Sequence, residues 1–348
     1  MSATFRFIHF SDPHLAIEPR RFNALALARR KPFLQLDTFK RLGSSRLNQL
    51  RNPSTFMPEI LHAAARFLLE YSDIVDAVMF TGDLATTGMM ADLEVASRYT
   101  MPASPGKFRS SQGHVTLCQD GVDFYAIPGN HDRYQDNLGS SSSIHYDIQF
   151  SKFSESYHNK VSHSVRSKDG INLAIICGDF CLQSDDDSVD TFVDKAIDQV
   201  QRPLKKPLIG RFSRYGQGKV YTSILSEMTE RTLSLRSKYA DCAVVWAIHF
   251  APFDCGNSLR LIDWEDYVEA AQRLKISLTL CGHTHDQRVM KYTDHLVYCA
   301  GSCGCTDSVD DSRMHIVEIS ISDDIRIRRE NYKWNSRDGE FIFESVDE

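Results

Sequence analysis

The chain has 348 residues, of which 42% are hydrophobic and 25% are charged, and this composition is typical of a globular protein with a sizeable core. The formal net charge is -6 and no long basic stretch offsets it, which argues against a non-specific interaction with nucleic acid. Small anionic substrates are compatible with this balance.

The N-terminal residues lack a basic segment followed by an apolar one, so we expect no signal peptide. The longest hydrophobic run, residues 243–253, is interrupted by His249 and is too short to span a bilayer. Nine cysteines are an odd number, and several lie inside apolar runs, which favours reduced thiols over a disulfide framework. We therefore expect a cytoplasmic location.

The first predicted strand, residues 5–10, is followed by Asp12 and His14. These two residues are separated by one position, so in extended backbone both side chains point to the same side and suit one metal ion. Residues 17–57 predict an excursion from the core. Their basic side chains favour a solvated helical face over a patch that contacts phosphate or a membrane surface, and no other segment suggests membrane contact.

Helical spacing over residues 59–71 leads into a predicted strand over 76–81, which ends at Gly82-Asp83. A further helix is predicted around 92–99, and the prolines, glycines and serines of 101–113 predict a loop. This order of elements is a β-α-β pattern.

The apolar run 122–127 predicts a strand that ends at Pro128-Gly129. Asn130 and His131 are therefore expected in a tight turn at the tip of that strand. Residues 139–143 follow so closely that they could form a lip over a site, although a plain surface loop is the simpler interpretation.

A strand over 173–177 precedes a second predicted excursion, residues 181–222, which could shape substrate access. Its acidic run lacks the ligand spacing and glycine of an EF-hand, so we interpret it as a solvated loop. The remaining elements are helices over 223–238 and 264–274, strands over 243–250 and 277–281, and an antiparallel C-terminal part from about 296 with strands over 296–300, 313–321, 324–332 and 341–343.

Five polar clusters each follow a predicted strand, so they would converge at one place. Together they supply two carboxylates, four imidazoles and one amide oxygen: Asp12, His14, Asp83, Asn130, His249, His283 and His285. Such N and O donors without thiolate suit Mn, Fe or Zn. Seven ligands exceed what one ion needs and fit two ions that share a bridging carboxylate. Two ions about 3.5–4 Å apart suit phosphoryl substrates.

The predicted catalytic residues are His131 and Asp132. His131 adjoins a predicted ligand and is available to donate a proton to a leaving oxygen. Asp132 would orient His131 or a ligand. Cys299, Cys303 and Cys305 are better explained as small residues in a glycine-rich turn than as a soft-metal site. Three more residues could equally contact the substrate or belong to the scaffold: Arg133, Tyr134 and Arg260.

The ordered set Asp12-Pro13-His14, Gly82-Asp83, Gly129-Asn130-His131-Asp132, His249 and Gly282-His283-Thr284-His285 resembles the five motifs of calcineurin-like metallophosphoesterases. The resemblance implies a single domain over 1–348 with an α/β fold, a four-layer αββα sandwich of two mixed β-sheets flanked by helices. It also implies that Asp12, His14, Asp83 and His285 bind one metal and that Asp83, Asn130, His249 and His283 bind the other, with Asp83 bridging.

We therefore predict a phosphoric ester hydrolase with two divalent or mixed-valence ions, in which a metal-bridging hydroxide attacks phosphorus. Residues 40–43 and 47–48 are similar to a segment of a bacterial branch that includes cyclic-nucleotide phosphodiesterases and UDP-2,3-diacylglucosamine pyrophosphatases. A phosphodiester or a nucleotide-type pyrophosphate, such as a cyclic nucleotide or nucleotide-sugar, is the favoured substrate. The alternatives are a phosphomonoesterase, a nuclease, or a non-catalytic metal-binding interaction scaffold, which the complete ligand set disfavours.

Overall fold

The structure is a computed structural model, and it describes residues 2–16, 56–103, 106–133, 144–150, 160–181, 218–239, 242–255, 259, 261–305 and 311–348. The predicted excursions at 17–57 and 181–222 fall mostly outside these residues, as does the predicted lip at 139–143. The membrane-facing role considered for 17–57 therefore stays a prediction.

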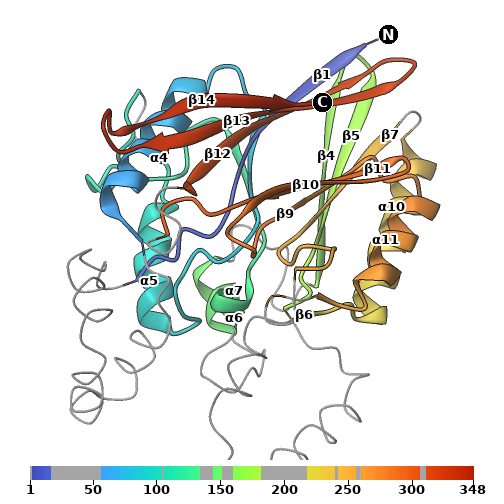
Figure 1. Cartoon of the computed structure of the whole chain (residues 1–348), viewed down its shortest axis with the longest axis horizontal. Helices are drawn as coiled ribbons and strands as arrows, with labels where there is room; N and C mark the ends of the chain where they lie inside the picture. The colour runs from blue at the N-terminus through green and yellow to red at the C-terminus, as the bar shows by residue number, and fades with distance from the viewer. Residues whose placement is uncertain are drawn as a thin grey trace, which may run out of the picture.

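The first sheet combines N-terminal and C-terminal strands. They are β1 (Ala3–Phe10), β2 (Ala77–Phe80), β3 (Asp123–Ala126), β12 (Arg313–Ile321), β13 (Ile325–Asn335) and β14 (Glu340–Asp347). Their order is β14-β13-β12-β1-β2-β3, with β1, β2 and β3 parallel and the C-terminal three antiparallel. Figure 1 shows the red C-terminal strands next to the blue β1. The chain therefore closes its first sheet with its last strands.

The second sheet contains the strands from the middle of the chain. They are β4 (Val161–Lys168), β5 (Ile171–Gly178), β7 (Cys242–Ile248), β9 (Leu278–Cys281), β10 (Gln287–Tyr292) and β11 (His295–Ala300). Their order is β10-β11-β9-β7-β5-β4, and only the two edge strands are antiparallel to their neighbours. The strand predicted over 296–300 thus runs parallel to β9 and does not join the C-terminal meander.

Helices cover the outer face of each sheet, as Figure 1 shows with α4 on the left and α10 and α11 on the right. The helices are α4 (Pro58–Tyr71), α5 (Met90–Tyr99), α6 (Asn130–Arg133), α7 (Ile144–Gln149), α10 (Thr222–Lys238) and α11 (Trp264–Arg273). A short parallel pair, β6 (Gly218–Lys219) and β8 (Leu261–Ile262), lies apart from both sheets.

The alternation of buried side chains along each strand explains the layers. In β7, Val245 and its neighbours two positions away point into the layer between the two sheets. Val244, Trp246 and Ile248 pack instead with residues of α10 and α11. Because a strand that is buried on both faces must be apolar throughout, these continuous hydrophobic runs predict interior strands. The αββα sandwich of two mixed sheets is confirmed.

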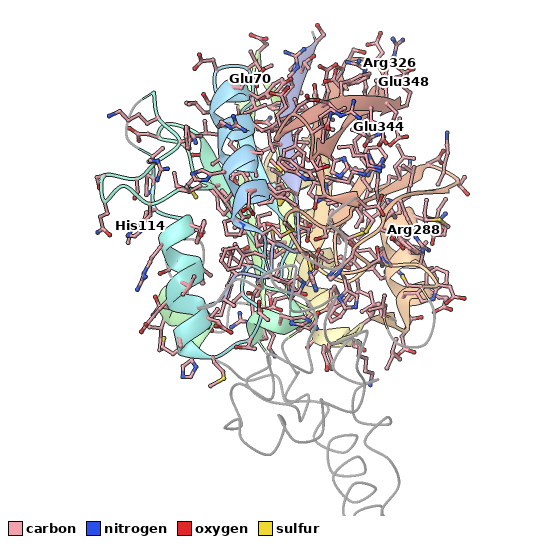
Figure 2. The ribbon with its side chains drawn as sticks, turned by 60° about the vertical axis from the view of Figure 1, so that its left-hand side comes forward. Glu70, His114, Arg288, Arg326, Glu344 and Glu348 are labelled. Atoms are coloured by element: carbon pink, nitrogen blue, oxygen red, sulfur yellow. The ribbon has the colours of Figure 1, made fainter. Side chains whose placement is uncertain are left out.

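Charged side chains protect the outer edge of the first sheet. Figure 2 shows Arg326, on β13, and Glu344 and Glu348, on or just after β14, and all three are exposed. Arg313 forms an ion pair of 2.6 Å with Glu344, which lies on the edge strand β14. Charges on an edge strand oppose pairing with another chain.

None of the helices in the described part of the chain is both long and apolar enough to cross a membrane.

Candidate metal centre

The seven predicted ligands come together where strands of both sheets end. They are Asp12 and His14 after β1, Asp83 after β2, Asn130 after β3, His249 after β7, and His283 and His285 after β9. All except His285 are buried. Because the carboxyl ends of parallel strands meet at one edge of a sheet, and the two sheets pack face to face, these residues share one site.

The carboxylate of Asp83 lies at the middle of this site. Its Oδ2 atom is 3.4 Å from Nε2 of His249, 3.7 Å from Nε2 of His14 and 3.9 Å from Nε2 of His131. Two sets of possible metal donors share Asp83, one with His14 and His131 and one with His249 and His283. This central position is the one that a bridging ligand needs.

Imidazole nitrogens face each other in pairs across the site. Nε2 of His14 lies 3.0 Å from Nε2 of His285, and Nε2 of His249 lies 3.2 Å from Nδ1 of His283. The Nδ1 atom of His249 donates to the carbonyl of Thr81 at 2.7 Å, so its Nε2 presents a lone pair to the site in the neutral ring. Facing lone pairs at this separation repel each other unless a proton or a metal ion lies between them.

A buried carboxylate oxygen also lacks a hydrogen-bond partner. Oδ1 of Asp12 has none among the residues that the structure describes, although Oδ2 of the same side chain accepts a hydrogen bond from the backbone N–H of His283 at 3.0 Å. A buried unpaired oxygen is costly in a protein interior. Together with the facing imidazoles, it shows that the donor set fits cations.

The local charges keep the carboxylates ionised. Burial alone would raise the pKa of Asp83, but His249, His131 and His14 hold it well below its ordinary value. Burial would lower the pKa of His249, and the charge and hydrogen bond of Asp83 instead raise it to about 9. Burial lowers the pKa of His14 to about 3, with His131 adding to the effect. Anionic oxygens and a neutral His14 are the protonation states that metal binding requires.

The backbone at this site is strained. Five of the seven residues have left-handed backbone, with φ values of 56° at Asp12, 53° at His14, 58° at Asp83, 72° at His283 and 58° at His285. Such conformations in residues other than glycine cost about 1–3 kcal/mol each and persist only where surrounding contacts hold them. The loop after β1 is held to the loop after β2 by backbone hydrogen bonds from Asp12 to Gly82 and from His14 to Asp83, at 3.0 and 3.1 Å.

Glycines permit these loops to approach one another. A Cβ atom on Gly129 would lie 2.1 Å from Oδ1 of Asp83, and one on Gly282 would lie 2.0 Å from Oγ of Ser11. These contacts are shorter than any that packed side chains allow. The glycines of the GNHD and GHTH sequences therefore make room for the ligands beside them.

His131 and Asp132 lie beside the seven residues in different ways. The Nδ1 atom of His131 donates to the carbonyl of Thr86 at 2.8 Å, and its ring packs edge-on against His14 at 4.5 Å. The carboxylate of Asp132 instead accepts hydrogen bonds from the backbone N–H groups of Leu84, Ala85 and Gly129, at 3.1, 2.8 and 2.9 Å. Thr86 thus orients the His131 ring, and Asp132 joins the loops that carry Asp83 and Asn130.

Burial and the nearby Asp83 charge raise the pKa of Asp132 to about 7, against the opposing effect of these hydrogen bonds.

Arg133 is part of the scaffold. It is buried and forms ion pairs with Asp147 at 2.9 Å and with Asp179 at 2.8 Å, while Tyr146 lies against its guanidinium at 5.1 Å. These contacts engage the guanidinium with buried groups of the protein itself. Tyr134 and Arg260, the other candidates for substrate contact, lie outside the described residues.

Replacing Arg133 with methionine is expected to lower the free energy of unfolding by about 3–5 kcal/mol, because it leaves two buried carboxylates without their cation. Urea denaturation followed by circular dichroism measures this change. The matched control is Arg98→Met on the exposed face of α5, which should stay close to the wild-type protein. Equal stability of the two variants would contradict the scaffold role.

Sequence reasoning missed one residue at the site. Cys305 is buried, and its Sγ lies in a group with the donor atoms of His14 and His285 whose members are all within 4.8 Å of one another. Cys303 instead contacts Met314, and Cys299 contacts Thr284, so the three cysteines do not gather into one site. The C-x-C spacing at 303–305 was the available signal, but it does not show that the second cysteine faces two histidines.

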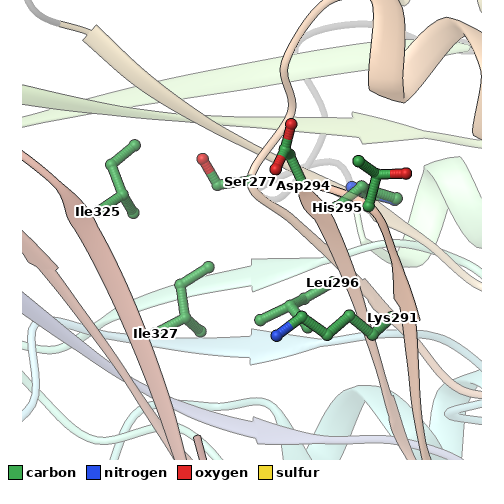
Figure 3. A pocket seen from close by; sticks show the side chains of 8 residues that line it. Ser277, Lys291, Asp294, His295, Leu296, Ile325 and Ile327 are labelled. Carbon is green, nitrogen blue, oxygen red and sulfur yellow. The ribbon is translucent and has the colours of Figure 1, made fainter.

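A separate pocket of about 290 Å³ lies at the other end of the strands. Figure 3 shows it between Ile325 and Ile327 of β13 on one side and Lys291, Asp294 and His295 of the β10–β11 hairpin on the other. Since β9 and β11 begin here and the candidate metal centre lies where β9 ends, this pocket is not part of that centre.

Comparisons with known proteins agree with this arrangement. The family model for calcineurin-like phosphoesterases matches residues 5–287. A search of curated proteins found no match. Among solved structures, a dimetal phosphatase from Danio rerio is similar, with 12% identity, a TM-score of 0.52, and coverage of 94% of this chain and 95% of that one.

The purple acid phosphatase PPD1 from yellow lupin (Lupinus luteus) is also similar, with 12% identity and a TM-score of 0.54. This similarity covers 99% of the present chain and 54% of the lupin chain. At these identities the two structures support the shared fold alone. The family match, which spans most of the chain, identifies this protein as a member of the calcineurin-like phosphoesterase family, and thus as a metallophosphoesterase that hydrolyses phosphoric esters.

Proposed function

We propose that the protein hydrolyses a phosphodiester or a nucleotide-type pyrophosphate at a centre of two metal ions. The observation that carries this proposal is the position of the Asp83 carboxylate between His14 and His249, each of which faces a second imidazole nitrogen across the site. Mixed nitrogen and oxygen donors support Mn, Fe or Zn as the metals.

The ligands divide into two groups around the shared carboxylate. Asp12, His14, Asp83 and His285 would hold one ion, and Asp83, Asn130, His249 and His283 would hold the other. The facing pair His14 and His285 supports the first group, and the contacts of His249 with Asn130 at 3.0 Å and with His283 at 3.2 Å support the second. When bound, two such ions supply positive charge to phosphoryl oxygens and acidify a water molecule.

His131 is the proposed proton donor to the leaving oxygen. Its Nδ1 proton is committed to the Thr86 carbonyl, so a proton given to the leaving oxygen would come from Nε2 of the imidazolium form, and Nε2 is the atom that faces Asp83 at 3.9 Å. The residue is 9% exposed, more than the buried Asp12 and His14, which supports access to substrate. Asp132 is proposed to position this residue through the backbone of the two loops that it joins.

The charges around the centre support a diester over a monoester. A phosphomonoester carries close to two negative charges at neutral pH and a diester carries one. No lysine or arginine of the described residues contacts Asp12 or Asp83, and Arg133 is engaged with Asp147 and Asp179. The described part of the site therefore offers little positive charge beyond that of the metal ions.

A cytoplasmic location and a single domain over 1–348 belong to the same proposal. None of the nine cysteines forms a disulfide, which supports a reducing compartment. The layer between the sheets is shared by residues from both, including Phe5 and Val245, which supports one folding unit.

Hydrolysis of bis(p-nitrophenyl) phosphate and of p-nitrophenyl phosphate in the presence of Mn²⁺ tests the substrate class. We expect the diester to be cleaved at least about tenfold more efficiently in kcat/KM, a difference of about 1.4 kcal/mol in transition-state stabilisation. Cleavage of the monoester alone would establish a phosphomonoesterase instead. The Asp83→Ala protein is the control for contaminating activity.

A further inference from the structure

Cys305 lies against one half of the metal centre. Its Sγ and the donor nitrogens of His14 and His285 are all within 4.8 Å of one another, and its side chain is fully buried. Thiolate sulfur is a ligand for Zn and for other borderline or soft metals. The distances place this sulfur among donors that already face a common point.

The backbone just before Cys305 is fixed to the site. The N–H of Cys303 donates to the carbonyl of Ser11 at 2.8 Å, and the hydroxyl of Ser302 donates to the carbonyl of Asp12 at 2.9 Å. Cys305 itself forms a β-bridge with Phe56, ahead of α4. The connection after β11 therefore carries Cys305 to the loop that bears Asp12 and His14.

A second observation points to a ligand at the same place. Oδ1 of Asp12 is buried and has no hydrogen-bond partner among the described residues, and it lies 3.6 Å from Nε2 of His285 and 3.9 Å from Nε2 of His14. These are the two histidines that Cys305 also approaches. An unpaired anionic oxygen, two imidazoles and a thiol around one point form a donor set for a cation with some affinity for sulfur.

We propose that Cys305 contributes a thiolate to the metal position formed by Asp12, His14 and His285, so that this half of the centre selects Zn, Fe or Co over Mn. The inference rests on the proposed two-metal function and refines one of its sites. Metal binding displaces the thiol proton to solvent, because the thiolate is the form that coordinates. The other position, with Asn130, His249 and His283, keeps only nitrogen and oxygen donors, so the two halves differ in metal preference.

Cobalt substitution of the full-length protein tests this directly. Apo protein is loaded with Co²⁺ and its absorption spectrum is recorded for wild type, Cys305→Ser and Cys303→Ser. Cys303 is the matched control, because it is buried two positions away and its Sγ contacts Met314 at 3.3 Å. We expect a thiolate-to-cobalt charge-transfer band in wild type and Cys303→Ser that is absent from Cys305→Ser.

Competition between Zn²⁺ and Mn²⁺ gives a second readout that does not depend on activity. Loss of the thiolate should reduce the preference for Zn²⁺ at one of the two positions by about tenfold or more. Circular dichroism establishes that each variant is folded. If Cys305→Ser does not fold, Cys305→Ala takes its place, because the wild-type spectrum alone does not say which cysteine gives the band.

The outcomes separate this inference from the proposed function. Wild-type protein that shows cobalt ligand-field bands without a charge-transfer band overturns the role of Cys305 and leaves the two-metal centre standing. Protein that binds no cobalt at all, and shows neither kind of band, overturns the metal centre itself. A charge-transfer band that persists in Cys305→Ser assigns the thiolate to another cysteine and also overturns the inference.

Discussion

Asp83→Ala is expected to lower turnover by about 10³-fold or more, because the transition-state stabilisation by two metal ions depends on this carboxylate. A factor of 10³ corresponds to about 4 kcal/mol. Asp83 is the residue that approaches His14 and His249 from one carboxylate oxygen. Its loss should therefore reduce the metal content at both positions, which inductively coupled plasma mass spectrometry measures alongside the rate of diester hydrolysis.

The matched control is Asp73→Ala, an exposed aspartate that lies before β2, at the end of that strand far from the site. This variant should keep the wild-type rate and metal content. Full activity in Asp83→Ala would refute the bridging role. Loss of a single ion would show that Asp83 serves one position only.

Replacement of His131 by alanine is expected to lower kcat by roughly 10²–10⁴-fold, the usual contribution of general acid catalysis, while both ions stay bound. The reason is its geometry, since Nδ1 is held by Thr86 and only Nε2 faces the site. A substrate with a better leaving group needs less protonation, so the defect should shrink with it. Steady-state kinetics on a series of substituted phenyl esters measures this dependence.

His114 supplies the control, because it is exposed and stands apart from the site in Figure 2. His114→Ala should behave as wild type in both rate and metal content. An unchanged defect across the series of leaving groups would show that His131 positions the substrate and does not transfer a proton. Loss of metal from the His131 variant would make it a ligand.

The strand ends that carry the site could be predicted because interior parallel strands are apolar on both faces and stop abruptly. Phe80 and Ile248 are the last residues of β2 and β7, and Asp83 and His249 follow them closely. Here local sequence and tertiary structure agree, since burial on both faces leaves no position for polar residues until the strand ends.

Two strands of the large sheets were not predicted, for the same physical reason. Both β4 and β10 are edge strands, and few of their side chains are buried. These two segments are strands because they pair with β5 and β11, and their local sequence does not indicate that pairing. The turn expected at Asn130 is instead the short helix α6, closed by a hydrogen bond from Arg133 N to the Gly129 carbonyl.

The sequence names candidate residues for the site, but it does not show their contacts. The five motifs include Asp12 and His285. Only the folded structure shows that Asp132 accepts hydrogen bonds from backbone N–H groups and that the His131 ring donates to the Thr86 carbonyl. Cys305 was assigned to a plain turn, because its approach to His14 depends on hydrogen bonds between segments almost the whole chain apart. Such long-range backbone contacts leave no periodic pattern in the sequence.

Because the proposed ligands come from both sheets, metal binding would stabilise the packing of one sheet on the other. Asp12, His14 and Asp83 follow strands of the first sheet, whereas His249 and His285 follow strands of the second. An ion held from both sides binds only while the sheets are packed together, so its occupancy adds to the cohesion of the sandwich, by about 2.7 kcal/mol at a hundredfold excess over Kd. This linkage is reciprocal. A substitution that leaves a cavity in the layer between the sheets, far from the centre, should therefore lower the affinity for metal although it changes no ligand.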